Sequence, residues 1–248
     1  MNLDLTGKRA LVTGASQGLG RVIALELAGK GCEVFVNCAH NPANAQKVVD
    51  EIRAKGGVAE VCVCSVSDEK AVNEMFRCLG RIDILINNAR LDPWRRTSDM
   101  TEGEWWSMVM DVNLKGAFLC STAFFEQAKK LGWGRIVNIS SVRSFRAAEM
   151  SMIAYGVSKL GMHGLTRAFA QNGAEFGITA NTVAPGMVVT ENIHKRLSPE
   201  KYKEESAAIP LGRGAACEEI ADAVLFAIGN GYVTGETINI NGGMYYAP

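Results

Sequence analysis

The sequence predicts an α/β protein built on a doubly wound parallel sheet of about seven strands with helices on both faces. Short apolar runs alternate with longer segments of helical periodicity along most of the chain, a pattern typical of parallel sheets covered on both sides. No segment rich in Pro, Ser or Gly interrupts this alternation. The 248 residues are therefore expected to form one domain, 1–248.

The expected elements follow one another in the order that such a sheet requires. Strands are expected at 9–13, 33–37, 58–63, 83–87, 135–139, 178–183 and 236–240. Helices are expected at 19–29, 43–55, 68–79, 101–130 and 155–173. Ser67 is the expected N-cap of the third helix, and Thr101 with Glu104 has the spacing of a capping box. The polar segment 188–209 breaks the alternation and is predicted to be a small lid insertion.

The composition argues against several classes of partner. Lys and Arg number 26, as do Asp and Glu, so no net field favours nucleic acid or an anionic membrane surface. No run of 18 apolar residues predicts a membrane span, and the N-terminal residues do not resemble a signal peptide. Seven scattered cysteines suit the reduced thiols of a cytoplasmic protein, and no Cys/His spacing predicts a metal site.

A glycine-rich turn joins the first expected strand to the first helix. Gly14 permits the tight turn, Gly18 lets the backbone approach a pyrophosphate, and Gly20 lets the helix pack closely on the sheet. The helix N-terminus adds free N–H groups and a partial positive charge. The turn therefore predicts a dinucleotide site, with Ser16, Gln17 and Leu19 among its contacts.

The end of the second strand carries the expected selector for the cofactor ribose. An Asp or Glu there would bind the free 2′-hydroxyl of NAD and repel a 2′-phosphate. This chain has Asn37, His40 and Asn41, which supply neither a carboxylate nor an arginine. NADP is therefore favoured over NAD, while use of both cofactors stays open.

Tyr155 and Lys159 lie four residues apart on an expected helix, so their side chains share one face. A free phenol is a poor base at neutral pH, and a neighbouring ammonium group lowers its pKa. The pair is therefore predicted to act as an acid/base whose pKa is shifted toward neutral pH. Taken alone, a surface Tyr and Lys on an amphipathic helix accounts for the spacing as well.

Taken together, these motifs resemble those of the short-chain dehydrogenases/reductases, in the branch with a single Rossmann-type domain. The matching residues lie in order along the chain: the loop Gly14, Gly18 and Gly20, the segment Asn87-Asn88-Ala89, then Asn113, Ser141, Tyr155, Lys159, Pro185-Gly186 and Thr190. The resemblance implies an NAD(P)-dependent oxidoreductase acting on a CH–OH group.

The resemblance also implies roles for individual residues. Tyr155 would exchange a proton with the substrate oxygen, and Lys159 would hold the nicotinamide ribose and lower the Tyr155 pKa. Ser141 would hydrogen-bond the same oxygen, with Ser140 as its rival because neighbouring strand residues face opposite ways. Asn113 would hold a water that relays protons through Lys159. Further cofactor contacts are implied at Ser65, Val66, Asn88, Ala89, Pro185, Gly186, Val188 and Thr190.

Departures from the family pattern point to the substrate. Arg90 and Ser144 stand at usual glycine positions, and Ser65 replaces the usual Asp that holds adenine. With Arg90, the arginines Arg143 and Arg146 predict an anionic substrate, because the guanidinium fork recognises carboxylate, sulfonate or phosphate. A small sugar acid, sulfosugar or hydroxy acid is the favoured class, and Trp94 is a candidate for stacking on a sugar. The alternative is that the arginines pair with Glu102, Glu149 or Glu191.

Two other functions stay open. A 3-oxoacyl-acyl-carrier-protein reductase belongs to the same family, and a non-catalytic NAD(P)-sensing protein would show degenerate catalytic residues, which this chain does not have. A small-molecule substrate is the expected partner. The family resemblance further implies a homotetramer, or a homodimer, packed through the long helices.

Overall fold

The computed structural model describes residues 3–146 and 149–246, and its central sheet confirms the doubly wound prediction. The strand order is β3-β2-β1-β4-β5-β6-β9, and all neighbouring pairs are parallel. The strands are β1 (Arg9–Val12), β2 (Glu33–Cys38), β3 (Ala59–Val63), β4 (Ile84–Asn87), β5 (Gly134–Ile139), β6 (Ile178–Pro185) and β9 (Thr237–Ile240). The order reverses between β1 and β4, and ligands of such sheets bind beyond the carboxyl ends of the strands at that reversal.

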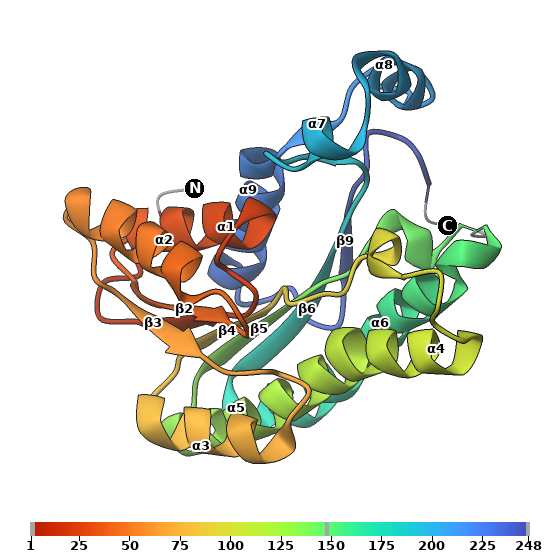
Figure 1. Ribbon diagram of the computed structural model, residues 1–248. Helices are drawn as coiled ribbons and strands as arrows, with labels where there is room; N and C mark the ends of the chain where they lie inside the picture. The colour runs from red at the N-terminus through yellow and green to blue at the C-terminus, as the bar shows by residue number, and fades with distance from the viewer. Residues whose placement is uncertain (1–2, 147–148, 247–248) are drawn as a thin grey trace.

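Helices cover both faces of the sheet (Figure 1). One face carries α1 (Gly18–Gly29), α2 (Pro42–Ala54) and α9 (Cys217–Gly229), and the other carries α3 (Glu69–Leu79), α5 (Gly116–Leu131) and α6 (Ile153–Gly173). Strand β1 shows why two layers are needed. Ala10 and Val12 belong to the core beneath the first set of helices, whereas Leu11 belongs to the core beneath the second. Both faces of this strand are thus apolar and must be covered.

Three helical features differ from the prediction. The expected helix 101–130 is divided into α4 (Glu102–Met110) and α5 by a π-helical turn, Asp111–Lys115. The N-cap of α3 is Asp68, whose carboxylate accepts a hydrogen bond from the Ala71 N–H, so the assignment to Ser67 is wrong. Helix α9 was not expected. The capping box of Thr101 and Glu104 is present as predicted.

The segment 188–209 contains one short strand and two short helices, β7 (Val188–Val189), α7 (Ile193–Arg196) and α8 (Pro199–Ala207). Strand β7 pairs with β8 (Ala215–Ala216), so the base of the segment is tied to the start of α9. Helices α7 and α8 stand apart from the main layers (Figure 1). Among the described residues, no helix combines the length and apolar character needed to cross a bilayer.

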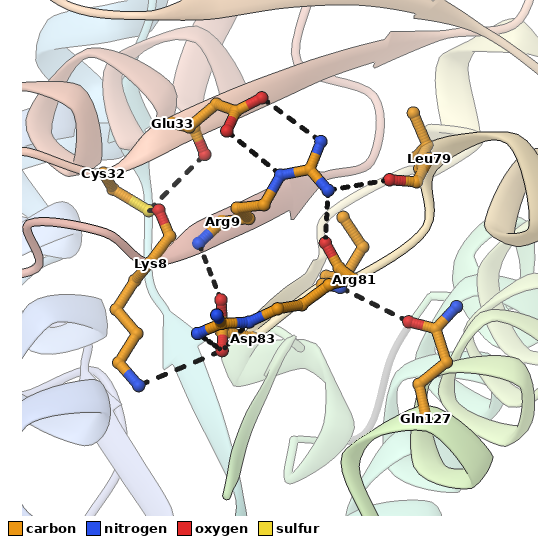
Figure 2. A network of polar contacts seen from close by, with 9 residues as sticks. Lys8, Arg9, Cys32, Glu33, Leu79, Arg81, Asp83 and Gln127 are labelled. Carbon is orange, nitrogen blue, oxygen red and sulfur yellow. Dashed lines mark hydrogen bonds and ion pairs between the residues drawn. The ribbon is translucent and has the colours of Figure 1, made fainter. Parts of the chain in front are cut away.

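Charged groups at the amino ends of the strands pair with one another (Figure 2). The buried Asp83 carboxylate accepts hydrogen bonds from the Arg9 main-chain N–H at 3.0 Å and from the Arg81 guanidinium at 2.7 Å. The Arg9 guanidinium in turn binds Glu33 and donates to the carbonyl oxygens of Leu79 and Arg81. Since a buried charge is tolerated only when it is paired, this network fastens β1, β2 and β4 at the edge opposite the expected ligand site.

Candidate active site

The glycines of the loop after β1 are required by close backbone packing. Gly14 and Gly18 have φ values of +62° and +56°, in the left-handed region that favours glycine. A Cβ on Gly14 would lie 2.8 Å from Cα of Ala89. A Cβ on Gly20 would lie 2.4 Å from Nδ2 of Asn88. Substitution at either position would therefore displace the loop that precedes α1.

Asn88 and Thr13 hold this loop against the end of β4. The Asn88 amide nitrogen donates to the carbonyl oxygens of Thr13 and Gly14, at 2.9 and 3.0 Å. The Thr13 hydroxyl oxygen accepts hydrogen bonds from the N–H groups of Asn88 and Ala89. The Asn88 side chain thus supports the loop, and any contribution to cofactor binding passes through the backbone that it positions.

The Asn37 side chain, at the end of β2, also holds the loop after β1 in place. Its side-chain oxygen accepts from the Gly14 N–H at 3.2 Å, and its nitrogen donates to the carbonyl oxygens of Cys62 and Cys64. The residue is 2% exposed, so its side chain does not present a ribose selector. His40 is exposed, and Asn41 caps α2 through the Asn44 N–H.

The start of α1 fits a dinucleotide pyrophosphate. Its N-cap, Gln17, makes no side-chain hydrogen bond to the helix, which leaves the first N–H groups to other partners. The Gly18 N–H donates to the Glu191 carboxylate at 2.9 Å, so an anionic oxygen already lies at this helix N-terminus. Thr190 stands beside Gly18, with its methyl carbon 3.6 Å from the position a Cβ would take. Ser16 is half-buried at the turn, and Leu19 is buried beneath it.

The other predicted cofactor residues frame the same end of the sheet. The Ser65 hydroxyl lies 2.9 Å from that of Ser67, and Val66 packs against Gly116, where a Cβ would come within 2.7 Å of it. Past β6, the Pro185-Gly186 turn is held by a hydrogen bond from the Gly186 N–H to the Ile240 carbonyl oxygen. Val188 follows in β7.

Ser141 and Tyr155 come together from two different elements. Ser141 follows β5, and Tyr155 lies in the first turn of α6. A hydrogen bond from the Ser141 side chain favours the ionised form of the Tyr155 phenol and so acts to lower its pKa. Ser140 points elsewhere, since its hydroxyl donates to the Lys159 carbonyl oxygen and lies 2.9 Å from Nε2 of His163. Of the two serines, Ser141 is the one that contacts the Tyr155 phenol.

Asn113 lies in the π-helical turn and joins three segments. Its side-chain oxygen accepts from the Leu91 N–H at 2.6 Å, and its nitrogen is shared between the Leu91 carbonyl oxygen and the Ser158 hydroxyl. Ser158 lies between Tyr155 and Lys159 on α6. The Asn113 side chain therefore fixes the loop after β4 to the helix that carries Tyr155 and Lys159.

The charges around Tyr155 differ from those expected. Burial raises the pKa of the Tyr155 phenol, and the largest influence that lowers it is the Arg90 guanidinium. Burial, reinforced by Arg90, lowers the pKa of Lys159 to about 7. The Lys159 ammonium donates to the Ile139 carbonyl oxygen at 2.8 Å and lies 5.8 Å from the centre of the Tyr155 ring. Arg90, rather than Lys159, is thus the main positive charge that acts to lower the Tyr155 pKa.

Two arginines of this region form ordinary ion pairs. Arg90 binds Asp92 at 2.6 Å, and Arg96 binds Glu102 at 2.7 Å. Arg143 differs, because its half-buried guanidinium has no ion-pair partner within 3–146 or 149–246. Its charge also acts to lower the Tyr155 pKa, which places it near the phenol. Arg146, at the end of the same loop, is exposed.

Trp94 is partly covered by the segment 188–209. Its side chain is 52% exposed, and the Arg196 guanidinium of α7 lies 4.4 Å from the ring centre. This cation–π contact uses one face of the ring that was expected to stack on a sugar.

Asp92 was not anticipated in this region. Glu191 was expected only as a partner of the arginines, whereas its carboxylate accepts the Gly18 N–H.

Comparisons with known proteins agree with this geometry. The family model for short chain dehydrogenases matches residues 8–201. The 3-oxoacyl-(acyl-carrier-protein) reductase FabG of Staphylococcus aureus is 39% identical over 244 residues, covering 96% of this chain and 98% of that protein.

Two solved structures are similar over almost the whole chain. A candidate gluconate dehydrogenase from Agrobacterium tumefaciens has a TM-score of 0.89 at 34% identity and covers 97% of both chains. A candidate NAD(P)-dependent gluconate 5-dehydrogenase from Beutenbergia cavernae, solved with bound NADP, has a TM-score of 0.86 at 34% identity and covers 97% of this chain and 98% of its own. The protein therefore belongs to the short-chain dehydrogenase/reductase family and is an NAD(P)-dependent oxidoreductase that acts on CH–OH or keto groups.

Proposed function

We propose that this enzyme transfers a hydride between NADP and a hydroxyl-bearing or keto carbon of a small sugar acid. The observation that carries the proposal is Arg143, a half-buried guanidinium near Tyr155 with no ion-pair partner among the described residues. A guanidinium held beside an acid/base group gains most from a ligand carboxylate, which it binds through two parallel hydrogen bonds.

The proposed chemistry divides between the cofactor and the chain. When bound, the cofactor supplies or accepts the hydride. Tyr155 stays protonated at neutral pH because burial raises its pKa, so it can donate a proton to a carbonyl oxygen and recover it in the reverse reaction. Ser141 would hold the same oxygen by a hydrogen bond. The loop from Gly14 to Gly20 would hold the pyrophosphate, and Lys159 the nicotinamide ribose.

The choice of a sugar acid draws on the site and on the relatives together. The two similar structures, which each cover 97% of this chain, are a candidate gluconate dehydrogenase and a candidate gluconate 5-dehydrogenase. Gluconate offers both a carboxylate for Arg143 and secondary hydroxyls for Tyr155. Sulfosugars and other hydroxy acids share these two features and form the wider class.

We infer a preference for NADP over NAD. The segment after β2 has no carboxylate to repel a 2′-phosphate, and the Asn37 amide is already used within the protein. One similar structure holds NADP. A higher kcat/KM with NAD than with NADP would contradict the preference.

A second candidate is the reduction of 3-oxoacyl groups on an acyl carrier protein, favoured by the 39% identity to FabG of Staphylococcus aureus. In that reaction, Arg143 would have no carboxylate on the acyl chain to bind. A sensor without catalysis is a weaker candidate, since Ser141 and Tyr155 are intact and in contact.

We also propose that the enzyme is a cytoplasmic homotetramer or homodimer. Exposed apolar side chains on α5 and α6 support a self-association surface, namely Phe118, Val157 and Leu160. Light scattering that gives a monomer at micromolar concentration would contradict the oligomer.

The substrate proposal is tested by removing the unpaired charge. With NADPH, Arg143→Ala should lower kcat/KM for 5-ketogluconate by about 10- to 100-fold, since a charge-assisted hydrogen bond is lost. The value for a neutral ketose of the same carbon length should change little, and Arg143→Lys should recover part of the loss. Arg167→Ala, at an exposed arginine of α6, is the matched control. Equal losses for the charged and the neutral ketone would contradict an anionic substrate.

A further inference from the structure

The chain turns back toward the active site after β9. Asn241 is buried at this turn, where its side-chain oxygen accepts from the Gly243 N–H and its nitrogen donates to the Tyr245 carbonyl oxygen, both at 3.0 Å. The turn packs on Gly186, where a Cβ would lie 2.9 Å from Cα of Asn241. The backbone at Tyr245 is thereby fixed relative to the Pro185-Gly186 turn.

Tyr245 meets the segment that follows Ser141. Its ring stacks on that of Phe145, with centroids 4.7 Å apart and planes 4° apart. The Phe145 ring also contacts His163 of α6, with centroids 4.9 Å apart and planes 62° apart. Phe145 is therefore held between the C-terminal turn and the helix that carries Tyr155 and Lys159.

The segment from Ser141 to Arg146, here called the serine loop, also carries hydrogen bonds within itself. The Arg143 N–H donates to the Ser141 hydroxyl oxygen, and the Ser144 hydroxyl donates to the Ser141 carbonyl oxygen at 2.6 Å. The N–H groups of Phe145 and Arg146 both donate to the Val142 carbonyl oxygen. These bonds shape the loop. Its contacts with the rest of the chain include the hydrogen bond between Ser141 and Tyr155, the buried Val142 and the two ring contacts of Phe145.

We propose that Tyr245 is a positioning residue for the reaction: by stacking on Phe145, it holds the serine loop so that Ser141 and Arg143 face Tyr155. Tyr245 acts on the site through Phe145, the residue on which its ring stacks. The C-terminal turn thereby becomes part of the substrate side of the site. The inference rests on the proposed function only for its kinetic test.

Amide hydrogen exchange tests the positioning without any substrate. In Tyr245→Ala, the amides of 143–146 should exchange faster than in the wild type, because their hydrogen bonds lie within the loop that the stack holds. Tyr245→Phe keeps the ring and should match the wild type. Tyr245→Leu, which keeps apolar bulk without a ring, covers the case in which the alanine variant does not fold. Tyr246→Ala, at a residue 79% exposed, is the control.

Kinetics then test the consequence for catalysis. Tyr245→Ala should lower kcat/KM for 5-ketogluconate about two- to tenfold while leaving the NADPH Kd unchanged. The double variant Tyr245→Ala with Phe145→Ala should show no lower kcat/KM than Phe145→Ala alone, because both substitutions remove the same contact between the two rings. Unchanged exchange in both the alanine and the leucine variant, or additive losses in the double variant, would overturn the inference. Faster exchange in an enzyme without activity on sugar acids would instead reject the substrate and leave the positioning role standing.

Discussion

Tyr155 lies where burial and charge act in opposite directions on one phenol. Burial raises its pKa, while Arg90, Ser141 and Arg143 act to lower it. Tyr155→Phe removes the proton and leaves the ring in place. We expect kcat to fall by about 10²- to 10⁴-fold, the usual contribution of a general acid, with the NADPH Kd unchanged. Steady-state kinetics and a fluorescence titration measure the two quantities. Turnover close to that of the wild type would remove Tyr155 from the reaction.

The sequence indicates which asparagines belong to the site but not what their side chains do. Asn37, Asn88 and Asn113 were expected at the cofactor or at a proton relay, and all three use their side-chain amides to hold backbone. Asn88 binds a carbonyl oxygen 75 positions earlier in the chain, a partner that depends on the pairing of β1 with β4. A motif fixes the residue type, whereas its hydrogen-bond partner is set by tertiary structure.

Glu191 joins the segment 188–209 to the start of α1, because its carboxylate accepts the Gly18 N–H. A cofactor pyrophosphate would meet a like charge there. We expect Glu191→Gln to lower the NADPH Kd about two- to fivefold, since the amide is neutral and interacts less with the helix dipole. Titration calorimetry measures the change. Glu200→Gln, at an exposed glutamate in the first turn of α8, is the control. Weaker binding in Glu191→Gln would mean that the carboxylate supports the cofactor rather than opposing it.

The elements themselves were largely predictable, because apolar runs and caps are local signals. The departures have non-local causes. The helical period continues through 101–130, but the π-helical turn inside it places Asn113 against Leu91, a contact between distant segments. Helix α9 is buried around much of its circumference, so it lacks the clear polar face that marks a surface helix. The stack of Tyr245 on Phe145 joins residues that lie 100 positions apart, so no periodic pattern in the sequence predicts it.

At the scale of the molecule, the buried His163 makes stability depend on pH. Burial, reinforced by Arg167, lowers its pKa to about 4, from an ordinary value of about 6.5 in the unfolded chain. Between these values the unfolded chain binds more protons, so the stabilising contribution is present above pH 6.5 and is lost as the pH falls toward 4. Over this pH range, we expect the free energy of unfolding of the wild type to fall by up to about 3 kcal/mol more than that of His163→Gln. Urea unfolding measures both values. Equal pH dependence in the two proteins would show that His163 does not set it.

The two edges of the sheet separate stability from function. At the amino ends of the strands, Arg9 pairs with Glu33, and Arg81 pairs with Asp83 (Figure 2). At the carboxyl ends, Arg143 has no such partner among the described residues. It lies near the Tyr155 phenol, whose pKa is raised by burial. The proposal of an anionic substrate rests on this unpaired charge at the ligand edge.

The most direct measurement of that claim compares two ketone reductions by the wild-type enzyme with NADPH: 5-ketogluconate, and a 3-oxoacyl group carried by an acyl carrier protein. If Arg143 binds a substrate carboxylate, kcat/KM for 5-ketogluconate should be higher by about tenfold or more, a difference of about 1.4 kcal/mol in transition-state binding. A higher kcat/KM for the carrier-bound oxoacyl group would contradict the sugar-acid assignment and identify the enzyme as a carrier-protein reductase.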